Sequence, residues 1–81
     1  EDSGDADEYL TQAIEIVVEC GQASVSLIQR KLKVGYARAG RIIDQMEMRG
    51  IIGPHEGSKP RNVLITKAQW HEMMMNTETE E

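Results

Sequence analysis

The 81-residue sequence predicts a mainly α-helical fold with one small β-hairpin, a winged helix-turn-helix. Two short amphipathic helices are expected in succession, joined at Val34-Gly35, which is the pattern of a helix-turn-helix. Two apolar runs follow directly, on either side of a loop rich in Gly, Pro and Ser, as in a hairpin wing. An amphipathic helix before these elements completes a three-helix core, and a short helix follows the wing.

An apolar stripe predicts the first helix, because its members recur every three or four residues: Leu10, Ala13, Ile14, Val17 and Val18. Gly21 is placed to end this helix. Cys20 lies at the end of the apolar face and is therefore expected to be buried rather than reactive. A single cysteine cannot form an internal disulfide, which fits a reducing compartment.

Capping residues predict where the next two helices begin and end. Ser24 and Ser26 can each cap the second helix, and Ser26 with Gln29 matches the capping-box spacing. Gly35 is expected to supply a left-handed turn, and Gly50 to end the third helix. The side chains that these helices are expected to bury are Leu27, Ile28, Leu32, Tyr36, Ala39, Ile42, Ile43 and Met46.

The wing is predicted from strands at residues 51–52 and 62–65, which flank the loop 53–60. Thr66 then caps the last helix, with Gln69 at the matching spacing. This helix is expected to pack on the domain's own core, or else to bind a partner, through an apolar side made of Trp70, Met73 and Met74.

Composition divides the chain into three parts. Residues 1–7 are acidic and nearly free of apolar side chains, so they are predicted to be a disordered linker. Residues 8–75 form the expected domain, and residues 76–81 an acidic, disordered tail. Since the sequence begins with Glu1 rather than Met, we expect it to be a piece of a longer protein.

Positive charge is concentrated in the middle of the sequence. The net charge of −5 would by itself argue against nucleic acid as a partner. However, all nine Lys and Arg lie between Ser24 and Lys67, against three acidic residues there, so this segment carries +6. Such segregation is expected of a basic binding face, although a solvated surface of mixed charge would also produce it.

Spacings of three and four place one set of residues on the outer side of the third helix: Ala37, Arg38, Arg41, Asp44, Gln45 and Met48. The second helix of a helix-turn-helix lies in the major groove of DNA. Arg41 is the candidate reader of guanine, because an arginine fork can donate to O6 and N7. Asp44 can select cytosine or orient an arginine, and Arg38 suits a phosphate. The competing interpretation is an exposed ion pair between Arg41 and Asp44.

Polar and cationic residues outside the third helix are candidates for contact with the DNA backbone. In the wing, Lys59 and Arg61 lie on either side of a proline, and Ser58 can donate a hydrogen bond to a phosphate. The second helix adds Arg30, Lys31 and Lys33.

The sequence has no signature of catalysis. His55 and His71 fall in different elements, and neither has the Cys, His or carboxylate neighbours of a metal site. The G-x-x-x-x-G-K-[ST] run of a nucleotide-binding loop does not occur. We therefore expect no enzymatic activity, metal, cofactor or small-molecule ligand.

An ordered set of runs spans residues 8 to 66: SVSLIQR in the second helix, GY opening the third, R-x-x-R-I-I-D-Q-M-E within it, then G-I-I-G-P and G-S-K-P-R in the wing. This set closely resembles the C-terminal gamma domain of the FtsK/SpoIIIE family of bacterial DNA translocases. The resemblance implies a winged helix that is tethered to a hexameric, RecA-like motor outside this segment. It also implies binding to double-stranded DNA at short, G-rich, polar octamers that direct the translocase during chromosome segregation at division or sporulation.

The resemblance implies further partners and a location. Some members contact a Xer recombinase, and the parent would act at the cytoplasmic face of the division septum, within a larger, membrane-anchored protein. The alternative function is a protein-protein docking module for the recombinase or the motor.

By position, the resemblance implies base contacts from Arg41 and Asp44 and backbone contacts from Lys59 and Arg61. We group Ala37 and Gln45 with the base-reading residues. Many members have Asn or Thr where this chain has Ala37, which would exchange a hydrogen bond for apolar contact with a thymine methyl. Gly40, where alanine is usual, is expected to cost the helix about 1 kcal/mol.

Overall fold

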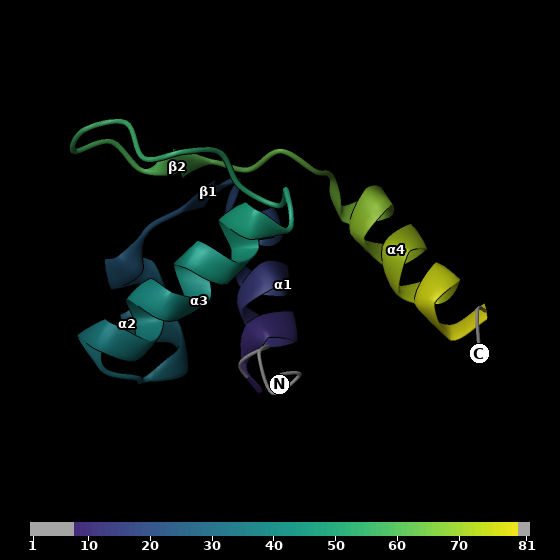
Figure 1. Ribbon diagram of the computed structural model, residues 1–81, viewed down its shortest axis with the longest axis horizontal. Helices are drawn as coiled ribbons and strands as arrows, with labels where there is room; N and C mark the ends of the chain where they lie inside the picture. Colours follow the sequence, from purple (N-terminus) through teal and green to yellow (C-terminus); the bar gives the residue numbers. More distant parts are fainter. Residues whose placement is uncertain (1–7, 80–81) are drawn as a thin grey trace.

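The computed structural model describes residues 8–79 and confirms the expected fold class (Figure 1). Its elements are α1 (Leu10–Cys20), β1 (Gln22–Ala23), α2 (Val25–Leu32), α3 (Tyr36–Met48), β2 (Arg61–Asn62) and α4 (Lys67–Thr79). The first three helices form a bundle, and the wing, residues 51–63, lies along one end of it (Figure 1). The expected linker at 1–7 lies outside the described residues, as do residues 80 and 81.

The core lies between α1, α2 and α3 and continues under the wing. Apolar residues at most 2% exposed come from all three helices, from β1 and from the first two wing residues: Ala13, Ile14, Val17, Ala23, Ile28, Ala39, Ile42, Ile43, Met46, Ile51 and Ile52. Burying one such isoleucine contributes about 1.5–3 kcal/mol, so Ile51 and Ile52 anchor the wing firmly at its origin.

Helix α1 ends as predicted, but its cysteine does not lie where we expected. Gly21 adopts a left-handed conformation, with φ of 81°, and its N–H donates to the carbonyl of Val17. Cys20 is exposed, so the expectation of burial was wrong. At about 100° per residue, Cys20 lies roughly 80° around the helix from Leu10. It therefore sits at the edge of the apolar stripe, in the last turn before the chain leaves for β1.

The turn between α2 and α3 differs from the expectation in one residue. Ser24 caps α2, because its Oγ accepts the N–H of Leu27 at 3.1 Å, whereas Ser26 lies inside the first turn. The left-handed residue after α2 is Lys33, with φ of 57°, and not Gly35. Helix α2 ends at Leu32, so the chain must reverse directly at the next position. Gly35 is instead the extended N-cap of α3.

Tyr36 is the one predicted core residue of α3 that is exposed, at 73%. It occupies the first turn of the helix, where its ring borders an open hollow between α2 and the wing. The later positions Ala39, Ile42, Ile43 and Met46 are buried as expected, because α1 and α2 cover that part of the helix.

The strands pair differently from the expected hairpin. β2 pairs in antiparallel fashion with β1, with Gln22 opposite Asn62 and Ala23 opposite Arg61. The expected partner, 51–52, forms only a bridge from Ile52 to Val63. The two-residue strand β1 was not anticipated, because a segment so short carries no alternating pattern. The wing is therefore held to the bundle through β1 as well as through its own two arms.

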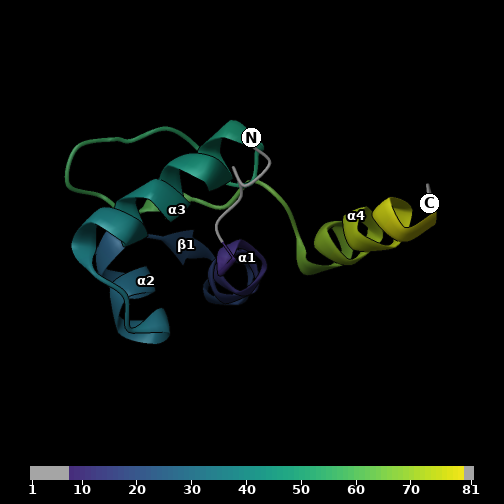
Figure 2. The same ribbon diagram turned by 60° about the horizontal axis from the view of Figure 1, so that its bottom comes forward.

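Helix α4 begins with the predicted capping box. The N–H of Thr66 donates to Gln69 Oε1 at 2.8 Å, and the N–H of Gln69 donates to Thr66 Oγ1 at 3.1 Å. Trp70 packs on the core, while Met73 and Met74 are each 40% exposed, so the expected packing is only partly present. In both ribbon views α4 lies on the side of α1 away from α2 (Figures 1 and 2).

The end of α4 also bears on the expected domain boundary. The helix continues to Thr79, beyond the boundary that we placed at residue 75. The boundary at residue 75 and the disordered tail after it stay predictions.

Candidate nucleic-acid interface

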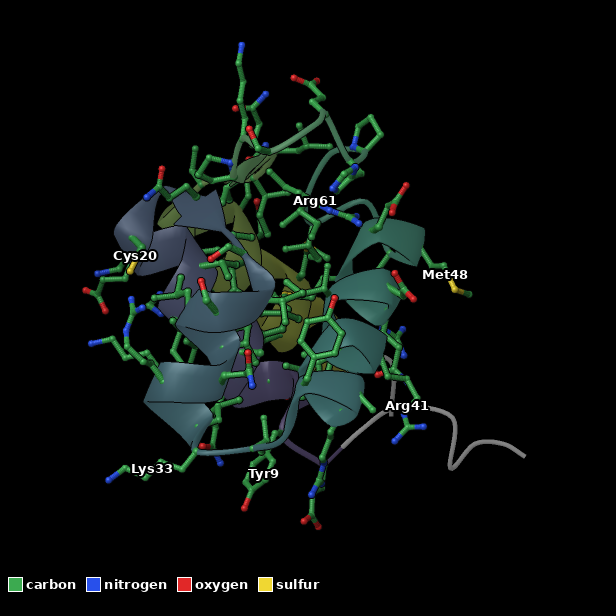
Figure 3. All side chains as sticks on the ribbon, turned by 90° about the vertical axis from the view of Figure 1, so that its left-hand side faces the viewer. Tyr9, Cys20, Lys33, Arg41, Met48 and Arg61 are labelled. Atoms are coloured by element: carbon green, nitrogen blue, oxygen red, sulfur yellow. The ribbon has the colours of Figure 1, made fainter. Side chains whose placement is uncertain are left out.

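The outer face of α3 presents the residues that the sequence assigned to base reading. Ala37, Arg41 and Asp44 are exposed, and Gln45 is half-buried on the same side. Arg41 and Met48 project from one side of the helix, with Cys20 across the molecule (Figure 3). Helical spacing places Asp44 between Arg41 and Met48 on that side.

The guanidinium of Arg41 is available for an external partner. No ion pair joins Arg41 to Asp44, both of which the structure describes, so the competing interpretation of an exposed pair is not supported. Together with Gln45, Met48 and Arg49, these two residues line a shallow hollow at the C-terminal half of α3. The hollow combines donors, acceptors and an apolar methionine that is 84% exposed, which suits contact with base edges.

The outer-face set predicted from the sequence did not include Arg49, which also lines this hollow. Arg49 directly follows the last residue of α3, but it lies four positions after Gln45 and eight after Arg41. Helical spacing could therefore have placed it on the same face.

Arg38 is turned toward the N-terminal end of α1. Its guanidinium carbon lies 4.7 Å from the centroid of the Tyr9 ring, and its Nη2 lies 3.4 Å from Glu8 Oε2. Both Arg38 and Glu8 remain accessible, with side chains 37% and 75% exposed. A phosphate would therefore compete with an exposed carboxylate for Arg38.

The wing separates its two cations. Ser58 and Lys59 are exposed beside Gly57, whose φ of 65° makes the sharp turn at the tip. Arg61 instead points between the wing and α3 (Figure 3), where its Nη1 donates to Glu47 Oε1 at 2.6 Å. Its side chain is only 14% exposed. The structure thus leaves Lys59 accessible to a phosphate and largely encloses Arg61.

The cations around α2 lie apart from the wing. Arg30 is exposed on α2, and Lys33 is exposed in the turn that follows. In Figure 3 Lys33 lies at the lower edge of the molecule, well away from Arg61 in the upper half. The predicted backbone contacts are therefore spread along the molecule and do not form one cluster.

Two further features bear on the class of protein. Within residues 8–79, no group of three or more His, Cys, Asp or Glu lies close enough to hold a metal ion. None of the helices in that range combines the length and hydrophobicity that crossing a bilayer requires.

Comparison with known proteins identifies the family. A family model described as "Ftsk gamma domain" matches residues 4–66, most of the chain. The chain belongs to the FtsK gamma domain family.

Curated relatives agree with this assignment. The chain is 65% identical to a DNA translocase FtsK of Clostridium tetani over 63 residues, or 78% of the chain. It is 58% identical to a DNA translocase FtsK of Sporosarcina ureae over 65 residues, or 80% of the chain. It is 51% identical to the DNA translocase SpoIIIE of Bacillus subtilis over 67 residues, or 83% of the chain. The matches cover 8% of each of these relatives, so the chain spans a small part of their length.

Membership in the gamma family distinguishes this domain from a translocase motor. DNA binding fits the family. The family match ends at residue 66, where the cap of α4 begins, so the wing and all of α3 lie inside the matched segment and α4 follows it.

Proposed function

We propose that this gamma domain binds double-stranded DNA sequence-specifically through the outer face of α3. The observation that carries the proposal is the position of Arg41. It is exposed on the second helix of the helix-turn-helix, and Asp44 and Gln45 share its face without an ion pair to neutralise it. An exposed arginine with no ion-pair partner can donate two hydrogen bonds from its guanidinium to one guanine.

The neighbouring residues have complementary roles in this proposal. Asp44 accepts from the N4 amine of a cytosine or orients Arg41, and Gln45 hydrogen-bonds an adjacent base. Ala37 offers apolar contact to a thymine methyl. Lys59 and Ser58 bind phosphates from the wing, with Arg30, Lys33 and Arg38 as further backbone contacts.

The proposed target is a short, G-rich, polar octamer, whose direction along the chromosome orients a hexameric translocase at the division septum. The domain has no catalytic part in this scheme and serves as the sequence reader. Names of the relatives support the translocase context, since they are DNA translocases of which this domain is a small part. A single domain offers limited contact area, so the hexamer would raise the effective concentration of several copies at one site.

A second candidate function is protein docking, with a Xer recombinase or the motor as partner. The observation that favours it is an apolar hollow between α1 and α4, lined mainly by Leu10, Ile14, Ile51, Trp70, Met73 and Met74. Arg49 lines both this hollow and the one on the outer face of α3, so a partner docked here would lie next to the proposed DNA face.

The proposal is tested by selecting bound duplexes from a random-sequence pool. Fluorescence anisotropy then compares the selected duplex with a scrambled duplex of equal composition, at two salt concentrations. Preference for the selected duplex that persists at higher salt supports sequence reading, because non-specific binding to phosphates weakens steeply with salt. Equal, salt-sensitive affinity for both duplexes contradicts sequence reading, and absence of binding to either favours the docking function.

A further inference from the structure

The shortest ion pair that the structure describes joins the wing to α3. Arg61 Nη1 donates to Glu47 Oε1 at 2.6 Å, across 14 positions in the chain. Glu47 lies in the last turn of α3, and Arg61 is the first residue of β2. Ala23, the β1 residue opposite Arg61, is fully buried. The base of the wing is thus attached to β1 through its backbone and to α3 through this side chain.

This pair differs in environment from the other ion pairs in residues 8–79. Arg38 with Glu8, and Lys67 with Glu19, have side chains from 37% to 75% exposed, at 3.4 and 3.0 Å. Pairs of that kind are screened by water and salt and contribute little. Glu47 is exposed to a similar extent, at 42%, but the Arg61 side chain is only 14% exposed, so the charge of Arg61 depends more on its partner for compensation. A short, charge-assisted hydrogen bond is also directional, and so restricts the angle between its two elements.

The tip of the wing needs such a restraint. Residues 54–60 are all exposed, and their own pairing is a bridge between Glu56 and Lys59. Apolar burial anchors the wing at Ile51 and Ile52, on the arm that enters it. On the returning arm Val63 and Ile65 pack partly against the core, and Arg61, nearer the tip, adds its ion pair to α3. Loss of the ion pair would remove the side-chain attachment closest to the tip on that arm.

We propose that Glu47 and Arg61 are positioning residues that fix the wing relative to α3, so that Lys59 meets a phosphate while Arg41 meets a base. We call this pair the wing clasp. This role replaces the direct phosphate contact expected of Arg61, and it rests on the proposed function of α3 as the DNA-reading helix. The wing clasp also explains why α3, a helix proposed to approach DNA, carries the acidic residue Glu47: its negative charge is compensated by Arg61.

The two roles of Arg61 predict opposite effects of Glu47→Gln. If Arg61 contacts a phosphate, the substitution frees its guanidinium and removes a negative charge near DNA, so binding tightens. If the wing clasp positions Lys59, the substitution weakens binding to the selected duplex about tenfold. Arg61→Gln then has a similar effect, and the double variant is no weaker than either single variant.

The clasp also couples Glu47 to Lys59 at a distance. Lys59→Ala should weaken binding in the wild-type background and have little further effect in Glu47→Gln, because the wing is then already misplaced. The salt dependence of binding should follow the same pattern. Lys59→Ala should reduce the slope of log K against log salt concentration by about one unit in the wild-type background, but should leave the slope unchanged in the Glu47→Gln background.

The experiment measures two properties of the same variants. Backbone ¹⁵N-{¹H} NOE values of residues 55–59 report the order of the wing without DNA, and anisotropy with the selected duplex reports binding. Glu19→Gln and Lys67→Gln break the exposed pair between α1 and the start of α4, and serve as matched controls. Thermal melts establish that each variant is folded.

Lower NOE values and weaker binding in Glu47→Gln and Arg61→Gln, but not in the controls, support the clasp. Arg61→Lys keeps the positive charge but loses the planar guanidinium, so it should bind DNA more tightly than Arg61→Gln and more weakly than the wild type. Wing NOE values in Glu47→Gln equal to wild type, or tighter DNA binding by that variant, would overturn the clasp. If the wild-type domain binds no duplex, the proposed function fails, while the NOE values still decide whether the pair orders the wing.

Discussion

The guanidinium of Arg38 stacks over the ring of Tyr9, with 4.7 Å between the guanidinium carbon and the ring centroid. This contact ties the N-terminal part of α3 to the residue that precedes α1. Arg38 is therefore both a structural contact and a candidate for DNA, and the two roles make separate predictions.

Replacing Tyr9 tests the structural role of this contact. Tyr9→Leu keeps an apolar side chain but removes the aromatic face, so it should lower the free energy of unfolding by about 0.5–1 kcal/mol through the lost cation–π interaction. Urea denaturation measures the change. In a double-mutant cycle with Arg38→Gln, the double variant should lose less free energy of unfolding than the sum of the losses in the two single variants. Strict additivity would show that the contact contributes nothing.

Arg41 is predicted to read a guanine. Arg41→Ala should weaken binding to the selected duplex by about 1–3 kcal/mol and relax the preference at one guanine, because both donors of the fork are lost. Anisotropy with duplexes altered at each position identifies that guanine. Lys67→Ala removes one positive charge outside the proposed interface and is the control. Equal losses on selected and scrambled duplexes would contradict the reading role.

Lys59 is predicted to act on the DNA backbone alone. Lys59→Ala should weaken binding to the selected and the scrambled duplex by the same factor. It should also reduce the magnitude of the slope of log K against log salt concentration by about one unit. Titrations at several salt concentrations measure this slope. A change in sequence preference, with the slope unaltered, would place Lys59 on a base instead.

The cap of α2 is predicted to depend on Ser24. Ser24→Ala removes the acceptor for the N–H of Leu27 and should lower the free energy of unfolding by about 1 kcal/mol. Ser26→Ala should change it by less than about 0.5 kcal/mol, because Ser26 lies on the surface inside the first turn. Chemical denaturation of the two variants compares them directly. A larger loss in Ser26→Ala would mean that the capping-box assignment from the sequence was the correct one.

Most of the fold was predictable because it follows from local patterns. The apolar stripe of α1, the αL glycine that ends it and the capping box of α4 all involve residues within four positions of one another. The outer face of α3 follows from the same periodicity, so the position of Arg41 on that face was predictable too. The wrong burial predictions lie at the ends of helices, where apolar spacing continues but neighbouring elements no longer cover the side chain. Cys20 and Tyr36 have apolar spacing, but each occupies a terminal turn that no neighbouring element covers.

The sequence by itself determined the helices, most of the core positions, the candidate reading residues and the gamma family. Only the tertiary structure decided what three of the cations contact. Arg61 pairs with Glu47 across 14 positions, Arg38 with Glu8 across 30, and Lys67 with Glu19 across 48. The pairing of β1 with β2 is of the same kind. Contacts between residues so far apart leave no periodic pattern in the sequence, because the packing of the elements against one another brings these residues together. A cation's type and exposure can be expected from local sequence, whereas its partner depends on the geometry of the whole domain.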